Sequence, residues 1–205
     1  MSILTNWNNF VYKLFNPTIA FISMAGLILY WIIKKRPASL KITKITFWTV
    51  LCSLIFQSLY LSILHLILWY NTPWGRALMP PVNPWSYSLH YVFVQYCKRN
   101  VFTIVGALLF MFIAYWFNKK YNEKFFYKEE IYLMGLSMLC NPWPGLIVLL
   151  IIVLFTSLII QIVNLFLTKH KRISMLYLWL PCSLLSFFIT YAILKYIPIL
   201  NTLFV

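Results

Sequence analysis

The stretch EEIYLMGLSMLCNPWPGLIVLLIIVLFTSLIIQIVNLFLT, residues 129–168, decides the fold class of this chain. Its second part, residues 146–168, contains no charged side chain. A helix of about 18 or more uncharged, mostly apolar residues is long enough to span the hydrocarbon core of a bilayer, which is about 30 Å thick. The stretch therefore predicts a protein that is solvated by lipid.

Composition extends this prediction to the whole chain. Of its 205 residues, 62% are hydrophobic and 10% are charged, whereas about a quarter of the residues in soluble domains are charged. No stretch outside the apolar runs is long enough to bury a core of its own. We therefore expect an all-α, polytopic membrane protein in which residues 1–205 form a single integral membrane domain.

The charge is strongly basic, with 17 Lys and Arg against 3 acidic residues and a net charge of +14. The basic residues flank the apolar runs instead of forming one cluster, which is the pattern of the positive-inside bias and not of a nucleic-acid surface. The expected partners are the lipid bilayer and other membrane proteins, without nucleic acid or a cofactor. The expected location is a bacterial inner membrane, with the mitochondrial inner membrane as the alternative.

The apolar runs predict five to six transmembrane segments. An interfacial segment, residues 1–16, precedes the first of them. The expected segments are residues 17–33, 45–70, 101–117, 131–140, 145–168 and 173–197.

The fourth segment, residues 131–140, is too short for an ordinary crossing, because ten residues of helix are only about 15 Å long. It ends at the helix-breaking sequence Asn-Pro-Trp-Pro-Gly, residues 141–145. Two alternatives stay open: the segment is the buried half of a longer helix that starts near Lys124, or it re-enters the membrane and turns back at the break.

The choice between these alternatives decides the topology. If the short segment crosses, three basic regions, residues 34–44, 119–128 and 169–172, all lie in the cytoplasm and both termini lie outside. Residues 119–130 are then a cytoplasmic loop. If the segment re-enters, five crossings remain and residues 169–172 fall outside, against the charge bias. The favoured prediction is six segments.

Residues 71–100 form the most irregular part of the sequence. Prolines interrupt it, and its Trp and Tyr residues are of the kind that lie at the headgroup level of a membrane. Pro84 can begin a helix that has its apolar side chains on one face. We expect an external loop that carries an amphipathic helix on the outer surface.

Few side chains of this chain are of the kinds that carry out catalysis. Glu129 and Glu130 lie at the mouth of the short segment, where one of them could act as an acid or base in a membrane-embedded site. The alternative is structural, since acidic residues are favoured in the first turn of a helix. His90, in the external loop, is the third candidate for a catalytic group. His65 lies deep in a predicted span. It could act there as a relay group or a ligand, or a hydroxyl could simply satisfy its hydrogen-bonding capacity.

A lipid- or anion-binding site is the other possibility. Arg76, Lys98 and Arg99 could converge with Asn83 and His90 on the outer face, because guanidinium and ammonium groups bind phosphate. Snorkelling of these cations to the interface explains their positions equally well. No metal site is expected, because the His and Cys residues do not have the spacing of metal ligands.

One family resemblance follows from residues 126–194. The segment Tyr127-Lys-Glu-Glu-Ile-Tyr-Leu-Met-Gly-Leu136 is followed by a Trp-Pro-Gly break, a long apolar helix, a basic clip and a second apolar helix. In hydropathy and spacing, this half of the chain resembles the prepilin peptidases, which are membrane aspartyl proteases. In that family a Gly-x-Gly-Asp motif opens a helix, and its Asp is one of two catalytic carboxylates.

The positions of the family's motif are only partly matched. The glycines fall on Tyr127 and Glu129, and the Asp falls on Glu130. The chain has no Asp at all, and it lacks the family's zinc site built from four cysteines. The resemblance therefore implies a relative of the fold without protease chemistry, since an aspartyl mechanism needs two carboxylates that share a proton.

Two functions follow as expectations. The favoured one is a non-catalytic membrane subunit of a multi-protein assembly such as a secretion or translocation apparatus, because the chain has few titratable groups and abundant apolar surface for helix partners. The alternative is a small membrane-embedded enzyme that acts on a lipid-linked or pilin-like substrate through Glu130, Glu129, His90 and Arg76.

Overall fold

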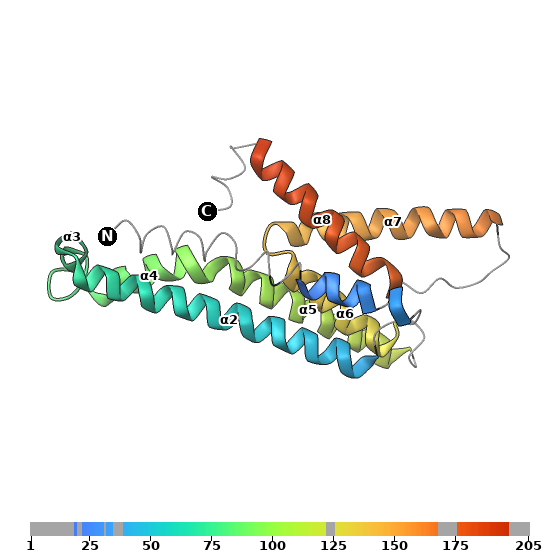
Figure 1. The fold of residues 1–205 in the computed structure, drawn as a ribbon, viewed down its shortest axis with the longest axis horizontal. Coiled ribbons are helices and arrows are strands. Elements are labelled where there is room, and N and C mark those ends of the chain that lie inside the picture. The colour runs from blue at the N-terminus through green and yellow to red at the C-terminus, as the bar shows by residue number, and fades with distance from the viewer. Residues whose placement is uncertain are drawn as a thin grey trace.

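The computed structural model describes residues 19, 22–30, 32–34, 39–121, 126–167 and 176–196, and every regular element in these ranges is a helix (Figure 1). The predicted interfacial segment at residues 1–16 and the basic clip at 169–172 lie outside the described residues. A helix at Ile22–Lys34 comes first. The others are α2 (Leu40–Asn71), α3 (Pro73–Ala77), α4 (Trp85–Val92), the π-helix η1 (Phe93–Cys97), α5 (Lys98–Lys120), α6 (Lys128–Cys140), α7 (Gly145–Leu167) and α8 (Leu176–Tyr196).

Three helical runs in the described part of the chain are long and apolar enough to cross a membrane. They are Leu40–Asn71, Trp85–Lys120 and Gly145–Phe166. They contain the predicted segments at 45–70 and 101–117 and all but the end of the segment at 145–168. The prediction of an all-α membrane protein is confirmed, and the number of full crossings stays a prediction.

The two longest runs form an antiparallel hairpin. α2 has 32 residues, about 48 Å of helix, and so exceeds the hydrocarbon thickness of about 30 Å. Helices α4, η1 and α5 follow one another without a break as one run of 36 residues. A short connection between the two runs contains α3, whose first turn is capped by Thr72, since its hydroxyl accepts a hydrogen bond of 3.2 Å from Gly75 N.

Residues 85–100 therefore differ from the expected external loop. The helix predicted there is present, but it continues directly into the next span instead of lying apart on the outer surface. No Pro or Gly interrupts the chain between Pro84 and Gly106, so nothing forces the helix to end. Polar side chains of this region also face polar side chains of α2, which holds the two helices together. The irregular part shrinks to residues 72–84.

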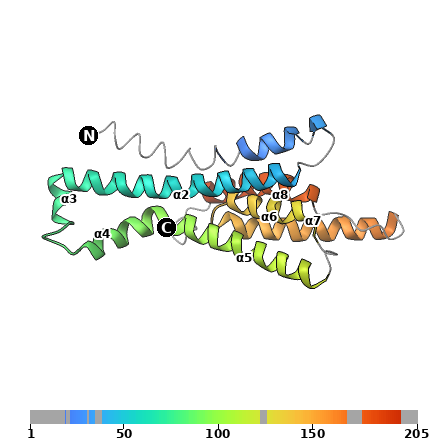
Figure 2. The ribbon, with the colours of Figure 1, turned by 90° about the horizontal axis from the view of Figure 1, so that it is seen from below.

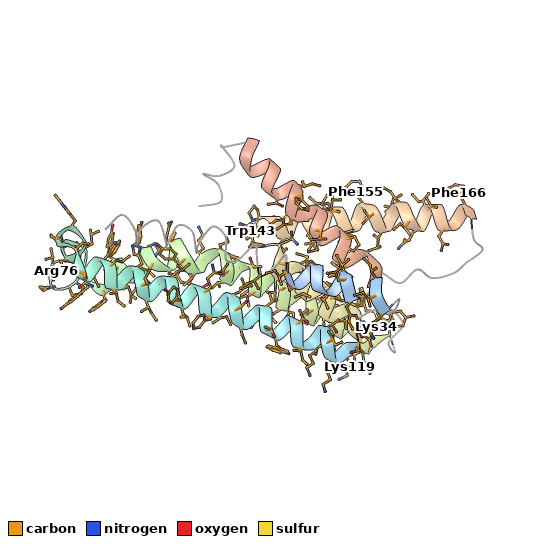
Figure 3. The ribbon with its side chains drawn as sticks, viewed as in Figure 1. Lys34, Arg76, Lys119, Trp143, Phe155 and Phe166 are labelled. Atoms are coloured by element: carbon orange, nitrogen blue, oxygen red, sulfur yellow. The ribbon has the colours of Figure 1, made fainter. Side chains whose placement is uncertain are left out.

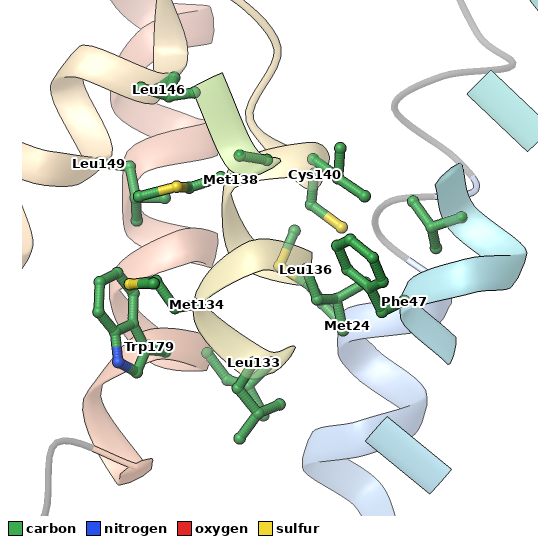
Figure 4. Close-up of a cluster of buried hydrophobic side chains, with 14 of the residues drawn as sticks. Met24, Phe47, Leu133, Met134, Leu136, Met138, Cys140, Leu146, Leu149 and Trp179 are labelled. Carbon is green, nitrogen blue, oxygen red and sulfur yellow. The ribbon is translucent and has the colours of Figure 1, made fainter. Parts of the chain in front are cut away.

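The short helix α6 lies at the centre of the bundle. It packs against α2, α5 and α8, and every residue from Glu130 to Cys140 except Tyr132 is buried. The Ile22–Lys34 helix closes another side, where Ser23 Oγ lies 3.7 Å from Cys140 Sγ. Figure 4 shows side chains from these helices converging on α6. Helix α6 begins at Lys128, so it is not the second half of a helix that starts near Lys124.

Helix direction brings the basic residues of different segments to one end. Figure 3 shows Lys34 and Lys119 near one end of α2 and Arg76 near its other end. Helix α6 runs away from the lysine end, and α7 runs back toward it (Figures 1 and 2). The topology in which the short segment counts as a crossing and the basic regions share one side stays a prediction.

Candidate functional site

The side chain of Glu130 caps the start of α6. The side chain of Glu130 is 2% exposed, and its Oε2 accepts a hydrogen bond of 3.2 Å from the backbone N–H of Tyr127. This bond satisfies a donor that the first turn of a helix leaves open, and the negative charge lies at the positive end of the helix dipole. Glu129 is half-buried beside it. The geometry favours the structural interpretation of this acidic pair.

The connection from α5 to α6 is held by one amide side chain. Asn118, 4% exposed, donates from Nδ2 to the carbonyl oxygen of Phe126 at 2.9 Å and accepts at Oδ1 from the Phe126 N–H at 3.1 Å. Two backbone groups outside a helix are thereby paired in an apolar environment. Asn118 fixes the place where α6 enters the bundle.

The end of α6 carries a buried network of uncharged polar groups. Asn141 Nδ2 donates to the carbonyl oxygen of Ser137 at 2.9 Å and to the hydroxyl of Ser183 on α8 at 2.6 Å. Ser137 Oγ in turn donates to the carbonyl oxygen of Trp179 at 3.3 Å. All four residues are at most 5% exposed. The network joins α6 to α8 where the break in the chain leaves backbone carbonyls without helical partners.

The same break is held from two further sides. Ser186 Oγ, on α8, donates to the carbonyl oxygen of Gly145 at 3.1 Å. On the other side, the N–H of Trp143 donates to Thr103 Oγ1 on α5 at 2.9 Å. About 22 Å of helix axis separates Thr103 from Asn118, so the break lies deep along α5. Both contacts use Ser or Thr hydroxyls, which commonly form hydrogen bonds between helices in membranes.

The sequence carried a signal for this network that the candidate residues did not include. Asn141 directly precedes a proline at the end of an apolar helix, where an amide side chain caps exposed carbonyls. Ser183 and Ser186 lie three residues apart, which places them on one face of α8. What the sequence does not reveal is that α6 and α8 are neighbours.

The predicted anion-binding residues are separated by the fold. Arg76 lies on α3, where its Nε donates to the carbonyl oxygen of Tyr70 at 2.7 Å, and Asn83 Nδ2 donates to the carbonyl oxygen of Ala77 at 2.7 Å. Both side chains thus stabilise the connection at residues 72–84. Lys98 begins α5 and follows α4 and η1, which together are about 20 Å of helix.

The remaining members of that set lie on the surface. His90, on α4, is exposed and lies among exposed aromatic side chains of the same helix. Arg99, next to Lys98, is also exposed. The structure brings Lys98 and Arg99 together at the start of α5, but it does not gather them with Arg76 into one site.

A second polar contact lies between α2 and the π-helix. The hydroxyl of Tyr96 and Nδ1 of His65 share a hydrogen bond of 2.9 Å. The His65 ring also lies 4.8 Å from the ring of Trp69 and 5.7 Å from the ring of Tyr91. His65 Nε2 is buried without a hydrogen-bond partner among the described residues. The hydroxyl that satisfies this histidine is therefore that of Tyr96, on the neighbouring helical run.

The contact between α2 and this run continues for two more helical turns. Ser62 Oγ lies 3.4 Å from Cys97 Sγ, and Asn100 Nδ2 donates to Ser58 Oγ at 2.8 Å. A π-helix adds a residue to its turn, so adjacent residues Tyr96 and Cys97 both reach α2. This ladder of neutral polar pairs explains why residues 93–100 pack on α2 despite their lower hydropathy.

The described part of the chain contains no group of three or more His, Cys, Asp or Glu residues that could hold a metal ion. Among the described residues, the polar side chains that meet between helices are amides, hydroxyls, thiols and one imidazole. Searches against protein families, curated proteins and solved structures found no match to this chain.

Proposed function

We propose that this protein is a non-catalytic integral membrane subunit of a multi-protein assembly, with secretion or translocation machinery as the class of assembly. The observation that supports this most is the use of its buried polar groups. Glu130 caps its own helix, and Asn141 is bonded to α6 and α8. Buried polar groups that hydrogen-bond to the backbone and to neighbouring helices stabilise the fold, and these bonds leave them less able to bind a substrate.

The outer surface supports the same proposal. Long helices present apolar and aromatic side chains along most of their length, among them Phe56, Phe112 and Phe155, which are 65% to 67% exposed. Such a surface contacts lipid or the helices of other membrane proteins. As part of this proposal, the assembly lies in a bacterial inner membrane, with the mitochondrial inner membrane as the alternative.

Purification tests the proposal directly. The full chain, tagged and extracted from its native membrane in a mild detergent, is expected to bring a fixed stoichiometric set of other membrane proteins. A chain that purifies alone and stays monodisperse contradicts the proposal. The variant Glu130→Gln keeps an acceptor oxygen for the Tyr127 N–H, so it is expected to assemble like the parent. Glu129→Gln, at a half-buried position without this bond, is its matched control.

A second candidate function, a small membrane enzyme acting on a lipid-linked substrate, is favoured by one feature. π-helical turns occur frequently at functional sites, and η1 places Tyr96 against the half-buried imidazole of His65. If this pair performs acid–base chemistry, His65→Gln abolishes turnover of the substrate while the protein still inserts and accumulates. Under the subunit proposal, His65→Gln changes only the stability of the hairpin.

A further inference from the structure

The hairpin of α2 with the run formed by α4, η1 and α5 carries aromatic and cationic side chains at both of its ends. On α2, about 39 Å of helix separates Lys44 from Tyr70. On the second run, about 37 Å separates Tyr91 from Trp116. The ring centroids of Trp69 and Tyr91 are 5.0 Å apart, so the two bands meet at this end. A bilayer with its headgroups is about 40–45 Å thick. The two bands therefore fit its two headgroup layers, where Trp, Tyr and cations are favoured.

Arg76 lies beside the band at the α3 end, and its exposed guanidinium is held in place (Figure 3). Its Nε donates to the carbonyl oxygen of Tyr70 at 2.7 Å, and its Cζ lies 5.6 Å from the centroid of the Tyr70 ring. The terminal nitrogens of this guanidinium make no hydrogen bond with the described residues. They form a planar fork that can bind two oxygens of one phosphate.

The connection that carries Arg76 is fixed by hydrogen bonds of its own. Asn83 Nδ2 donates to the carbonyl oxygen of Ala77 at 2.7 Å. The hydroxyl of Ser88, which is buried, donates to the carbonyl oxygen of Leu78 at 2.8 Å. A guanidinium that is held before its ligand arrives loses little conformational entropy when it binds, so this arrangement favours a bound anion.

The surroundings of Arg76 favour an anion that is part of a lipid. The described acidic residues, Glu129 and Glu130, begin α6, which lies away from α3 in both views (Figures 1 and 2). The neighbouring side chains are instead aromatic, and those of Trp74 and Trp85 are 88% and 55% exposed. Exposed indole rings lie among the headgroups of a membrane. A phospholipid offers both a phosphate for the guanidinium and apolar groups for these rings.

We propose that Arg76 binds the phosphate of a membrane phospholipid, with its guanidinium held by Tyr70 and the exposed ring of Trp74 in contact with the lipid. Of the three cations that the sequence suggested for an anion site, Arg76 is the one in the band. Lys98 and Arg99 follow Tyr91 by about 10 Å of helix or more, toward the other band. The site does not depend on the proposed role as an assembly subunit.

Photo-crosslinking of the full chain tests this site. The chain is reconstituted in digalactosyldiacylglycerol vesicles with a small fraction of phosphatidylglycerol that carries a diazirine in its headgroup, so the probe is the only phospholipid. Mass spectrometry locates the label, which we expect within residues 69–77 of the parent. Arg76→Gln should lower this label about tenfold or more, as expected for loss of charge-assisted hydrogen bonds. Arg76→Lys should restore only part of it, because an ammonium has no planar fork. Equal label in the parent and in Arg76→Gln overturns the proposal.

Two control variants separate this site from general charge and from local folding. Lys98→Gln removes an exposed cation on α5, and Asn83→Ala removes another side-chain hydrogen bond of the connection that carries Arg76. Both should keep the label at residues 69–77. A loss in either control as large as that in Arg76→Gln overturns the proposal. Inorganic phosphate on both sides of the vesicles should leave the label unchanged. If it removes the label, the site takes a soluble anion and the lipid proposal is refuted.

Discussion

The side-chain nitrogen of Asn141, at the end of α6, donates a hydrogen bond of 2.6 Å to the hydroxyl of Ser183, on α8. The same nitrogen donates to the Ser137 carbonyl oxygen at 2.9 Å. A carbonyl oxygen can only accept a hydrogen bond. The contact with Ser137 therefore requires the nitrogen of the Asn141 amide, and not its oxygen, at this place. This hydrogen bond ties the 13-residue helix α6 to the 21-residue helix α8.

Replacement of Asn141 is expected to loosen α6 from α8. Asn141→Ala leaves buried oxygen atoms without a donor and should lower the free energy of unfolding by about 1–3 kcal/mol. Asn141→Asp should cost more, since a carboxylate cannot donate to the carbonyl of Ser137. Thermal unfolding in detergent measures both. Thr49→Val, at an exposed hydroxyl that bonds only its own helix, is the control. A neutral Asn141→Ala would show that the network adds no stability.

Gly135 is expected to tolerate no side chain. A Cβ at this position would meet the Met111 side chain and come within 2.9 Å of Phe47 Cε2, and Phe47 is 1% exposed. Gly135→Ala should therefore destabilise the bundle by about 1–3 kcal/mol through overpacking. At Gly26 a Cβ would meet nothing within 4 Å, so Gly26→Ala should be neutral or stabilising. Equal effects of the two variants in a thermal unfolding assay would contradict the packing around α6.

Trp179 carries a buried polar group whose removal should change the free energy of unfolding only a little. Its ring is 5% exposed, yet its Nε1 has no hydrogen-bond partner among the described residues. Trp179→Phe removes this buried donor and also some ring volume, and the two effects oppose each other. The unfolding free energy should change by about 1 kcal/mol or less. A loss as large as that of Trp179→Ala, measured in parallel, would show that the indole N–H is satisfied.

The contact between His65 and Tyr96 can be measured by a double-mutant cycle. His65→Phe and Tyr96→Phe each remove one side of the hydrogen bond, and their coupling energy should be about 0.5–2 kcal/mol. The matched control pairs His65→Phe with Tyr91→Phe, because the contact of Tyr91 with His65 is a ring stack with 5.7 Å between the ring centroids. Coupling of equal size in both cycles would assign the interaction to ring packing alone.

The sequence predicts α7 well. Its expected bounds of 145–168 compare with Gly145–Leu167 in the structure. The reason is local: Pro144 and Gly145 end the preceding turn, and no charge or proline follows until Lys169. Helix ends that are set by prolines and charges can be found without knowledge of the neighbouring helices.

The central place of α6 could not be predicted in the same way. Its residues are almost uniformly apolar, so their pattern does not distinguish lipid from other helices as neighbours. The prediction for this segment rests on its length, on the break that follows it and on the charges around it. The same limit applied to residues 85–100, whose Trp and Tyr residues were assigned to the headgroup region, whereas Tyr96 and Asn100 bond side chains of α2. Pairings between segments far apart in the chain carry no local signal.

The shortness of α6 has a consequence for biogenesis. Its 13 residues make about 20 Å of helix, too little to stay across a bilayer unaided. Two of its stabilising partners, Trp179 and Ser183, belong to α8, which the ribosome synthesises after α6 and α7. A nascent chain that stops before residue 176 therefore lacks the acceptors for Ser137 and Asn141. We therefore expect α6 to reach its final position in the bundle only after α8 has been synthesised.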